Sequence, residues 1–468
     1  FEEKQGIRQG RSSSADKYKA GKNRLLHQLD CYTSNRIGHL PVGAIMVADD
    51  LVITAKEPYR QQISLNIAQC DAAKDRYKFN TDKTKTITLN SNDDHVFHLN
   101  GKPLGSSMAE LHLGIVRNSQ GDNTATNTER IKSARRATFS LLGAGYYGVN
   151  GVGPCVASFQ YKAYVVPTLL YGVEAIVPNT DDLKRLDQAH KKSLRRMQGL
   201  PDSTAIPGLY LLIGIPTIEA LIHIRALCLF RSIIAAEKPS PPSIFIKELI
   251  QRQLAMKDNS SHSWAAYIRK LLQRYQLPNP STLISDVPTK KKWAKVVKTA
   301  VNDHWLKTLV EEAKCKKSMS FLNAEKCSLS DTHPVWHDLH CPLDVMKATV
   351  KAKMLLQRYP LLTSHTARNQ RSETCMLCKQ EPETTSHFLL HCPALQKERN
   401  IYMPRILNTC RCQNISIGSE QVTKIILDSN HLNHPDRSHE ITCRNMIYKL
   451  HTRRANLLGS ETRYKSRT

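Results

Sequence analysis

The sequence predicts an α+β fold, on three observations. The first hundred residues alternate between short strand-like runs and turns. From about Asn127 onward, apolar residues recur at three- and four-residue intervals, as they do in amphipathic helices. Hydrophobic residues make up 40% of the 468 residues, enough to form packed cores. At about 150 residues per domain, a chain of this length holds roughly three domains.

Changes in composition divide the chain into five predicted segments. They are a mixed segment of hairpins and helices (1–122), a helical segment (123–238), a helical connector (239–360), a cysteine-rich region (361–400) and a basic helical C-terminal tail (401–468). The Pro239-Ser240-Pro241-Pro242 run is the clearest linker signal.

In the first segment, the clearest element is a hairpin. Two short apolar runs, Ala44–Val47 and Leu51–Thr54, flank Ala48-Asp49-Asp50, which places two carboxylates at a turn. A helix is expected over residues 61–77. Further strands are expected over residues 86–90, 95–99 and 111–116.

The remaining segments favour helices. The helical spacing predicts them over residues 131–142, 158–171, 183–197, 218–234, 244–256, 263–275 and 290–312. The helix over 183–197 carries six cations beside its apolar positions: Lys184, Arg185, Lys191, Lys192, Arg195 and Arg196. Such a face is either simply solvated or a site of phosphate contact.

The charge of the chain restricts the classes of partner. There are 67 Lys and Arg residues against 41 Asp and Glu residues, a net charge of +26. This excess indicates a polyanion, either nucleic acid or an anionic membrane surface. No run of about 18 uninterrupted apolar residues exists, so nucleic acid is favoured and no membrane partner is expected. The oligomeric state cannot be predicted.

The cysteines point to a reducing compartment and to one metal site. Thirteen cysteines without a signal-peptide pattern predict reduced thiols in an intracellular protein, in the nucleus or cytoplasm. Cys375, Cys378, His387 and Cys392 follow a C-x2-C-x8-H-x4-C spacing. Four soft or borderline ligands within eighteen residues predict a closed, structural Zn²⁺ site. His391 is a weaker rival to His387, and ordinary thiols are the alternative.

Asp49 and Asp50 could hold Mg²⁺ or Mn²⁺, although a lone Asp-Asp pair is more often a polar turn. The sequence motifs around this pair favour a metal site. GIRQGRSSSADKYK, GAIMVADDLVITAK, RYKFNTDKTKTITLN and AELHLGIVRN stand in the order found in reverse transcriptases of non-LTR (LINE-type) retrotransposons, which the chain resembles. Val47 stands where that family usually has an aromatic residue before Ala-Asp-Asp.

The resemblance implies roles for particular residues. Gln9 and Gly10 match the element that lines the incoming nucleotide and template. Asp49 and Asp50 match the catalytic metal ligands, Asn80 matches a nucleotide-binding position, and Lys83 matches the lysine placed near the triphosphate. Residues 111–115 (LHLGI) resemble the hairpin that grips the primer.

The same resemblance implies an architecture and a reaction. Residues 1–122 would be part of a right-hand polymerase palm, 123–238 a helical thumb, and 361–400 a CCHC zinc knuckle. The expected function is RNA-directed DNA polymerase, with RNA template, DNA primer, target DNA and deoxynucleoside triphosphates as partners. The family's first catalytic Asp should lie upstream of Gly6, so we expect a C-terminal fragment that is inactive alone. The alternative functions are a catalytically inactive nucleic-acid-binding relic and, less favoured, a membrane-surface protein.

Overall fold

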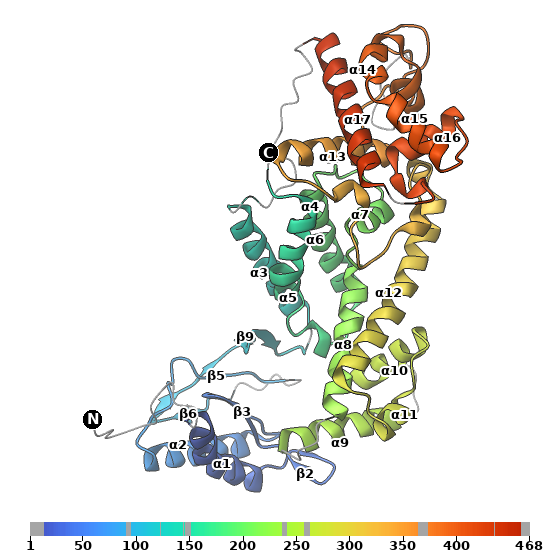
Figure 1. The fold of residues 1–468 in the computed structure, drawn as a ribbon. Coiled ribbons are helices and arrows are strands. Elements are labelled where there is room, and N and C mark those ends of the chain that lie inside the picture. Colours follow the sequence, from blue (N-terminus) through green and yellow to red (C-terminus); the bar gives the residue numbers. More distant parts are fainter. Residues whose placement is uncertain are drawn as a thin grey trace.

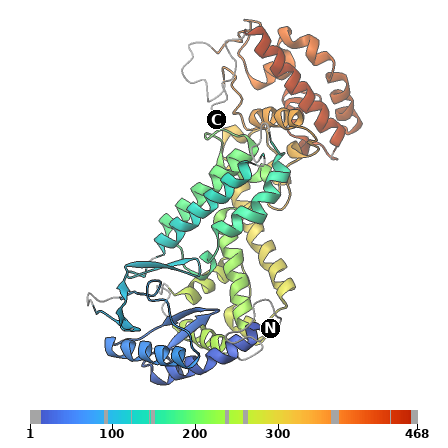
Figure 2. The same cartoon turned by 90° about the vertical axis from the view of Figure 1, so that its left-hand side faces the viewer.

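Strands gather in the first part of the chain and helices make up the rest. The computed structural model describes residues 14–89, 95–121, 123–143, 145, 151–235, 241–256, 263–363, 373–434 and 436–459. Every strand within these residues ends before residue 119, and helices dominate from residue 124 onward, which confirms the α+β class (Figure 1). The elongated molecule carries the strands at one end and the last helices at the other, with long helices between them (Figures 1 and 2).

The N-terminal part combines two helices with small sheets. The helices are α1 (Ser14–Tyr32) and α2 (Pro58–Lys74). The strands are β1 (Arg36–Ile37), β2 (Leu40–Pro41), β3 (Ala44–Val47), β4 (Asp50–Ile53), β5 (Lys85–Thr86), β6 (His98–Leu99), β7 (Lys102–Pro103), β8 (Gly105–Ser106), β9 (Ala109–His112) and β10 (Ile115–Asn118). They form five two-stranded sheets within the described residues, four antiparallel and one, β5 with β8, parallel.

The β3–β4 hairpin is packed on one face only. Alternate residues Ala44, Leu51 and Ile53 contact the buried side chains of Leu25, Leu29 and Ala68 on α1 and α2. The opposite face carries Ile45 and Val47, which are 47% and 46% exposed. A side chain at Gly43 would come within 2.5 Å of the Leu29 carbonyl oxygen, so glycine permits this close approach of hairpin and helix.

Helices build the middle of the molecule. They are α3 (Thr124–Leu142), α4 (Pro154–Gln160), the π-helix η1 (Tyr161–Val165), α5 (Val166–Leu169), η2 (Val173–Ala175), α6 (Thr180–Gln198), α7 (Ile206–Ile213), α8 (Ile218–Ile234), α9 (Pro241–Ala255), α10 (Trp264–Arg274), α11 (Pro280–Ser285) and α12 (Lys290–Lys314). The long helices α8 and α12 pack side by side, and α9 reaches β1 of the N-terminal part (Figure 1).

The C-terminal end is also helical. Short helices η3 (Lys317–Met319), η4 (Ala324–Lys326) and η5 (Pro334–Trp336) lead to α13 (Pro342–Leu355). After the cysteine-rich region come η6 (His387–His391), η7 (Pro393–Leu395), α14 (Gln396–Asn400), α15 (Met403–Cys412), α16 (Ser419–Leu427), η8 (Ser429–His431) and α17 (Arg437–Leu457). Helix α17 packs against α13, α14 and α15.

The hydrophobic cores cross the predicted segment boundaries. The largest buried cluster takes side chains from Ala134 on α3 to Leu450 on α17 and includes Cys375 and Cys392. A second cluster joins α8 to α9, α10, α11 and α12. Three smaller clusters hold only three buried residues each; two of them, around Leu25 and Leu65, lie in the N-terminal part. The segments from residue 123 onward therefore share cores, whereas residues 1–122 hold two small clusters of their own.

The basic C-terminal segment predicted to be helical over residues 401–468 is helical in its described part. Residues up to Gly459 form packed helices, and Cys443, Met446, Ile447 and Leu450 are fully buried. Several of the cations of this segment are paired or buried on α17, among them Arg437, Arg444 and Arg454. Residues 460–468, which hold the rest of the basic run, lie outside the described residues.

Within the described residues, no single helix has both the length and the apolar character needed to cross a bilayer. Helices α7 and α8 meet that criterion only as a pair, with a 56° bend between them.

Candidate metal centre and polymerase motifs

The four predicted zinc ligands come together in the structure. The Sγ atoms of Cys375, Cys378 and Cys392 and a ring nitrogen of His387 all lie within 4.8 Å of one another. The Cys375 and Cys392 sulfurs are 3.9 Å apart, close to the ~3.8 Å that tetrahedral geometry gives for Zn–S bonds of about 2.3 Å. This Cys3His group could therefore bind a metal such as zinc, and its four protein ligands would leave no position for water.

A tight backbone turn presents the first two sulfurs. The Cys375 N–H donates to the Glu381 carbonyl oxygen at 2.8 Å, and the Lys379 N–H donates to the Cys375 carbonyl oxygen at 2.8 Å. Lys379 has a left-handed φ of 55°, which reverses the chain directly after Cys378. An antiparallel bridge between Thr374 and Pro382 closes the loop.

Glu381 orients the histidine ligand, a role that sequence spacing did not predict. The His387 Nδ1 atom lies 2.9 Å from Glu381 Oε2, so Nδ1 donates and Nε2 is left as the ligand atom. The Nε2 atom lies 3.3 Å from the Cys378 sulfur. His391, the rival ligand, is exposed and is not part of the group.

The surroundings of the thiols favour a bound cation. Burial acts to raise the pKa of the Cys378 thiol, but hydrogen bonds from the backbone of Gln380 and Glu381 and from the side chains of Cys375 and His387 together outweigh it and lower that pKa to about 7. Burial and the adjacent Cys375 raise the pKa of the Cys392 thiol. A second thiolate is therefore unfavourable here unless positive charge joins the group, as a divalent metal would.

The last ligand is fixed by a buried arginine. Cys392 follows η6, and Arg399 donates from Nε to the Leu389 carbonyl oxygen and from Nη2 to the Cys392 carbonyl oxygen, both at 2.8 Å. Phe388 on η6 is buried and packs on Tyr359 with ring centroids 5.7 Å apart. Phe388 thus belongs to the core and is not available to stack on a base.

A buried ion pair joins the metal region to the last helix. Arg454 of α17 makes two hydrogen bonds, of 2.8 and 3.0 Å, to the carboxylate of Glu383. Glu383 also accepts the Leu362 N–H at 3.0 Å. Through Glu383, the segment that carries the metal ligands is therefore bound both to α17 and to Leu362.

Asp49 and Asp50 lie at the tip of the β3–β4 hairpin, as predicted. Val47 pairs with Asp50, and Ala48 takes a left-handed φ of 55° in the turn. Both carboxylates are exposed. Within the described residues, no third His, Cys, Asp or Glu joins them in a group that could hold a metal, so the structure does not support a Mg²⁺ site by itself.

The loop that follows α2 gives Asn80 a structural role. Its Oδ1 atom accepts the N–H groups of Asp82 and Lys83 at 3.0 and 3.2 Å, which leaves only its amide nitrogen free for a nucleotide. The Lys83 side chain is exposed. Gln9 and Gly10 lie outside the described residues.

Residues 111–116, predicted as one strand from their pattern and as a hairpin from the family resemblance, form a tight hairpin. Strands β9 and β10 pair with His112 opposite Ile115, and Leu113 and Gly114 between them have φ values of 50° and 78°. Two positive φ values match the twist of paired strands and explain the glycine. Arg130 of α3 donates to the Gly114 carbonyl oxygen, which ties the hairpin to the helical part.

The six cations of α6 share one face of that helix. At 100° per residue, their side chains fall within an arc of about 140°. Lys184, Arg185, Lys192 and Arg196 are exposed, while Lys191 and Arg195 are half-buried. Several have partners: Lys184 pairs with Asp181, Lys191 pairs with Asp187, and Arg185 donates to Thr128. Exposed cations therefore remain on this face, but they number fewer than the six counted in the sequence.

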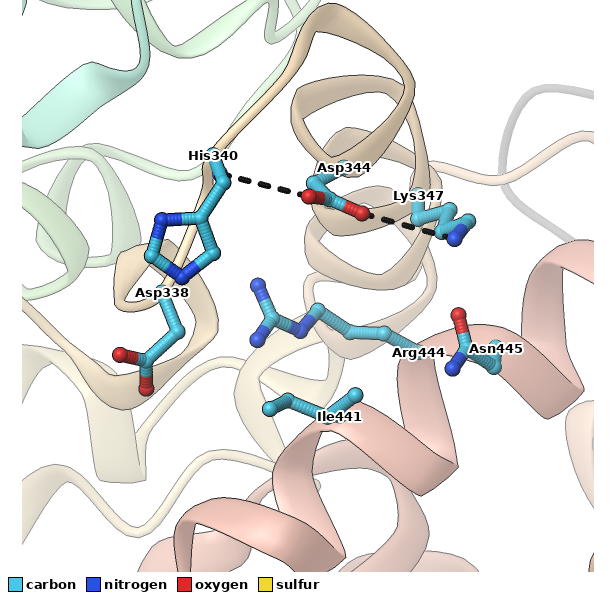
Figure 3. Close-up of a pocket in the computed structure, with 7 residues that line it drawn as sticks. All are labelled: Asp338, His340, Asp344, Lys347, Ile441, Arg444 and Asn445. Carbon is cyan, nitrogen blue, oxygen red and sulfur yellow. Dashed lines mark hydrogen bonds and ion pairs between the residues drawn. The ribbon is translucent and has the colours of Figure 1, made fainter.

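A small pocket of about 110 Å³, lined mostly by charged and polar residues, lies between α17 and the first turns of α13 with the segment before it. Arg444 reaches from α17 towards His340 and Asp338 (Figure 3). The charges largely satisfy one another, because Asp344 pairs with Lys347 and Asp338 pairs with Arg437 outside the pocket. The pocket therefore offers no clear excess of charge to a ligand.

Comparison with protein families finds none that matches the chain, and comparison with curated proteins finds no match.

Proposed function

We propose that this chain is the palm-to-knuckle portion of a non-LTR retrotransposon reverse transcriptase. In the intact protein it would copy RNA into DNA by two-metal nucleotidyl transfer. The supporting observation is the Asp49-Asp50 pair at the exposed tip of a hairpin that α1 and α2 back on one face only. Polymerase carboxylates need such a position, because the metals, the primer end and the triphosphate must all reach them.

The donor set fits part of a magnesium site. Asp49 and Asp50 provide hard carboxylate oxygens, which Mg²⁺ prefers, and a third carboxylate would have to come from outside the described residues. The resemblance places that residue upstream of Gly6. When bound, the metal ions would activate the primer hydroxyl and neutralise the leaving pyrophosphate. Exposed Lys83 would add positive charge beside the triphosphate.

The helical part would hold the nucleic acid. The exposed cations of α6 would contact phosphates, and Lys132 and Arg135 are exposed on α3, which packs against α6. The metal region would keep α13 and α17 in place, since its ligands lie in their shared core.

Primer extension tests this proposal. The purified chain is compared with a protein extended upstream in the same reading frame, on an RNA template with a DNA primer and Mg²⁺. We expect extension only by the longer protein, and we expect Asp49→Asn or Asp50→Asn to reduce it at least a thousandfold. Asp82→Asn, at an exposed loop acid, is the matched control and should retain activity. Robust extension by the 468-residue chain alone would contradict the need for a third carboxylate.

The second candidate is a catalytically inactive nucleic-acid-binding relic. It is favoured by one observation, that Asp49 and Asp50 join no three-ligand group among the described residues. RNA binding by the extended protein without any extension, and without an effect of Asp49→Asn, would support the relic. A stop codon or the loss of an Asp-bearing strand motif upstream would do the same.

A further inference from the structure

Two glutamine side chains of α2 hold the β6–β7 hairpin, and the polymerase proposal gives neither of them a role. Gln62 and Gln69 are seven positions apart, so they lie on the same face of the helix. Gln62 accepts the His98 N–H and donates to the His98 carbonyl oxygen, both at 2.9 Å. Gln69 accepts the Asn100 N–H through Oε1 at 2.7 Å. The hairpin is therefore fixed to α2 at two separate points.

Asn100 connects this anchor to the next loop of the chain. Asn100 and Gly101 form the two-residue turn between β6 and β7, with φ values of 52° and 73°. An Asn-Gly pair adopts such a turn readily, because both positions need a positive φ. The Asn100 Nδ2 atom donates to the Phe79 carbonyl oxygen at 3.3 Å. Asn100 therefore bonds to α2 through its backbone and to the loop after α2 through its side chain.

The loop that carries Lys83 is closed on Asn80. The Asn80 side chain accepts the N–H groups of Asp82 and Lys83, and its carbonyl oxygen accepts the N–H of Thr84 at 3.0 Å and the Thr84 hydroxyl at 2.8 Å. These four bonds make the loop a single unit. It begins at Phe79, whose ring packs against both small N-terminal cores, and it continues into β5, which pairs with β8 over only two residues. The place of the loop is therefore set mainly at Phe79.

The same helix supports the aspartate pair. Ala68, directly before Gln69, is buried against the β3–β4 hairpin that carries Asp49 and Asp50. Helix α2 thus backs this hairpin with one residue and reaches the Lys83 loop with the next. In the proposed reaction both groups act on one triphosphate, and small errors in the relative placement of such groups are costly.

We propose that Gln69 and Asn100 are positioning residues for Lys83. They hold its loop in a fixed place relative to Asp49 and Asp50, so that the ammonium group meets the triphosphate that the metal ions also contact. Both act through the loop and not by contact with the nucleotide. This inference rests on the proposed function and extends it to residues that no motif marks.

Steady-state primer extension by the upstream-extended protein tests the assignment. Gln69→Leu removes the acceptor for the Asn100 N–H at a similar side-chain size. We expect the KM for the deoxynucleoside triphosphate to rise about ten- to a hundredfold, the range for losing hydrogen bonds to a charged group. The KM for template–primer should stay within about twofold, whereas a variant that misfolds would lose both. Gln69→Glu keeps a carboxylate oxygen as acceptor and should restore the nucleotide KM.

A double-mutant cycle shows whether Gln69 acts through Lys83. If it does, Gln69→Leu/Lys83→Gln should have the same nucleotide KM as Lys83→Gln alone. Effects of the two changes that multiply would mean that they act independently, and would overturn the proposal.

The matched control is Gln62→Leu, which removes the same side chain from the same face of α2 but leaves the Asn100–Phe79 bond in place. Its nucleotide KM should stay within about twofold of the wild type. Equal effects of Gln62→Leu and Gln69→Leu would show that any loosening of the β6–β7 hairpin matters, and would also overturn the proposal.

The failure of this inference is distinguishable from that of the proposed function. If the extended wild-type protein does not extend a primer, the proposed function is wrong and the positioning role is wrong with it. If the wild type extends the primer and Gln69→Leu leaves the nucleotide KM unchanged, only the positioning role is overturned.

Discussion

The two ends of the molecule hold their candidate metal ligands in opposite ways. At the C-terminal end, Cys375, Cys378, His387 and Cys392 converge within the largest core, and neighbouring residues orient them. At the N-terminal end, Asp49 and Asp50 stand exposed at a hairpin tip above a core of only three buried residues. The first group has four candidate ligands among the described residues and lies in a packed core. The second is open and incomplete, as a site that must admit large substrates and a further ligand would be.

The largest effect should come from removing the metal. Zinc binding to structural sites is worth on the order of 10 kcal/mol, so Cys392→Ser should abolish zinc binding and loosen the whole C-terminal end. We expect one zinc per wild-type chain and none in the variant, measured by elemental analysis. Hydrogen exchange should accelerate over residues 373–457 and remain unchanged over residues 14–118. Cys412→Ser, at an exposed cysteine outside the group, should keep its zinc. Equal loss of protection at both ends would erase the distinction between them.

The next largest difference in stability is expected between breaking a buried ion pair at the C-terminal end and an exposed one at the N-terminal end. Arg454→Met leaves the Glu383 carboxylate, 1% exposed, without its partner, so unfolding free energy should fall by about 3–5 kcal/mol. Arg60→Met breaks the exposed Arg60–Glu57 pair of the N-terminal part and should cost about 0–1 kcal/mol. Denaturant unfolding measures both. Similar losses from the two variants would mean that burial does not distinguish these pairs.

The stability of the helical core should fall as the pH is lowered. Burial lowers the pKa of His190 to about 4, and the neutral ring lies 2.6 Å from the Tyr161 hydroxyl through Nδ1 and 3.1 Å from the Pro216 carbonyl oxygen through Nε2. An unfolded histidine has a pKa of about 6.5, so between pH 6.5 and 4 the unfolded state binds the extra proton. Stability should therefore fall by about 3 kcal/mol as pH falls through this window. In His190→Gln, that part of the pH dependence should be absent from denaturant titrations.

The smallest effect on stability is expected at the hairpin tip. Asp49→Asn changes an exposed side chain at a turn and should alter unfolding free energy by less than about 0.5 kcal/mol. The same change should abolish primer extension by the upstream-extended protein. A large loss of stability would indicate that Asp49 holds the fold together, contrary to the open site proposed here.

Local sequence patterns predicted the individual helices, strands and sites better than they predicted how these pack together. The x2, x8 and x4 spacings identified all four members of the Cys3His group, because a short loop and a short helix can bring together only nearby residues. The Asp49-Asp50 turn was also predicted from residues that are neighbours in the sequence. The residue pattern alone predicted one strand at Leu113-Gly114, because a glycine inside an apolar run gives no sign of which way the chain turns; only the family resemblance implied the hairpin.

Residues that act across long sequence distances could not be predicted. Arg454 pairs with Glu383 from 71 positions away, and sequence composition made it part of a basic tail. Arg399 and Glu381 lie close to the ligands, but no spacing rule marks which nearby charge turns inward. The acids between the second cysteine and the histidine were the only available signal for Glu381.

The Glu383–Arg454 pair also affects the order in which the protein can be made. A ribosome releases the metal-binding cysteines well before α17, yet α17 covers them and supplies the cation that neutralises Glu383. The nascent chain must therefore carry an unfinished apolar surface until α17 emerges, a period in which association with chaperones is favoured. A premature stop before Arg437 would leave that surface open permanently.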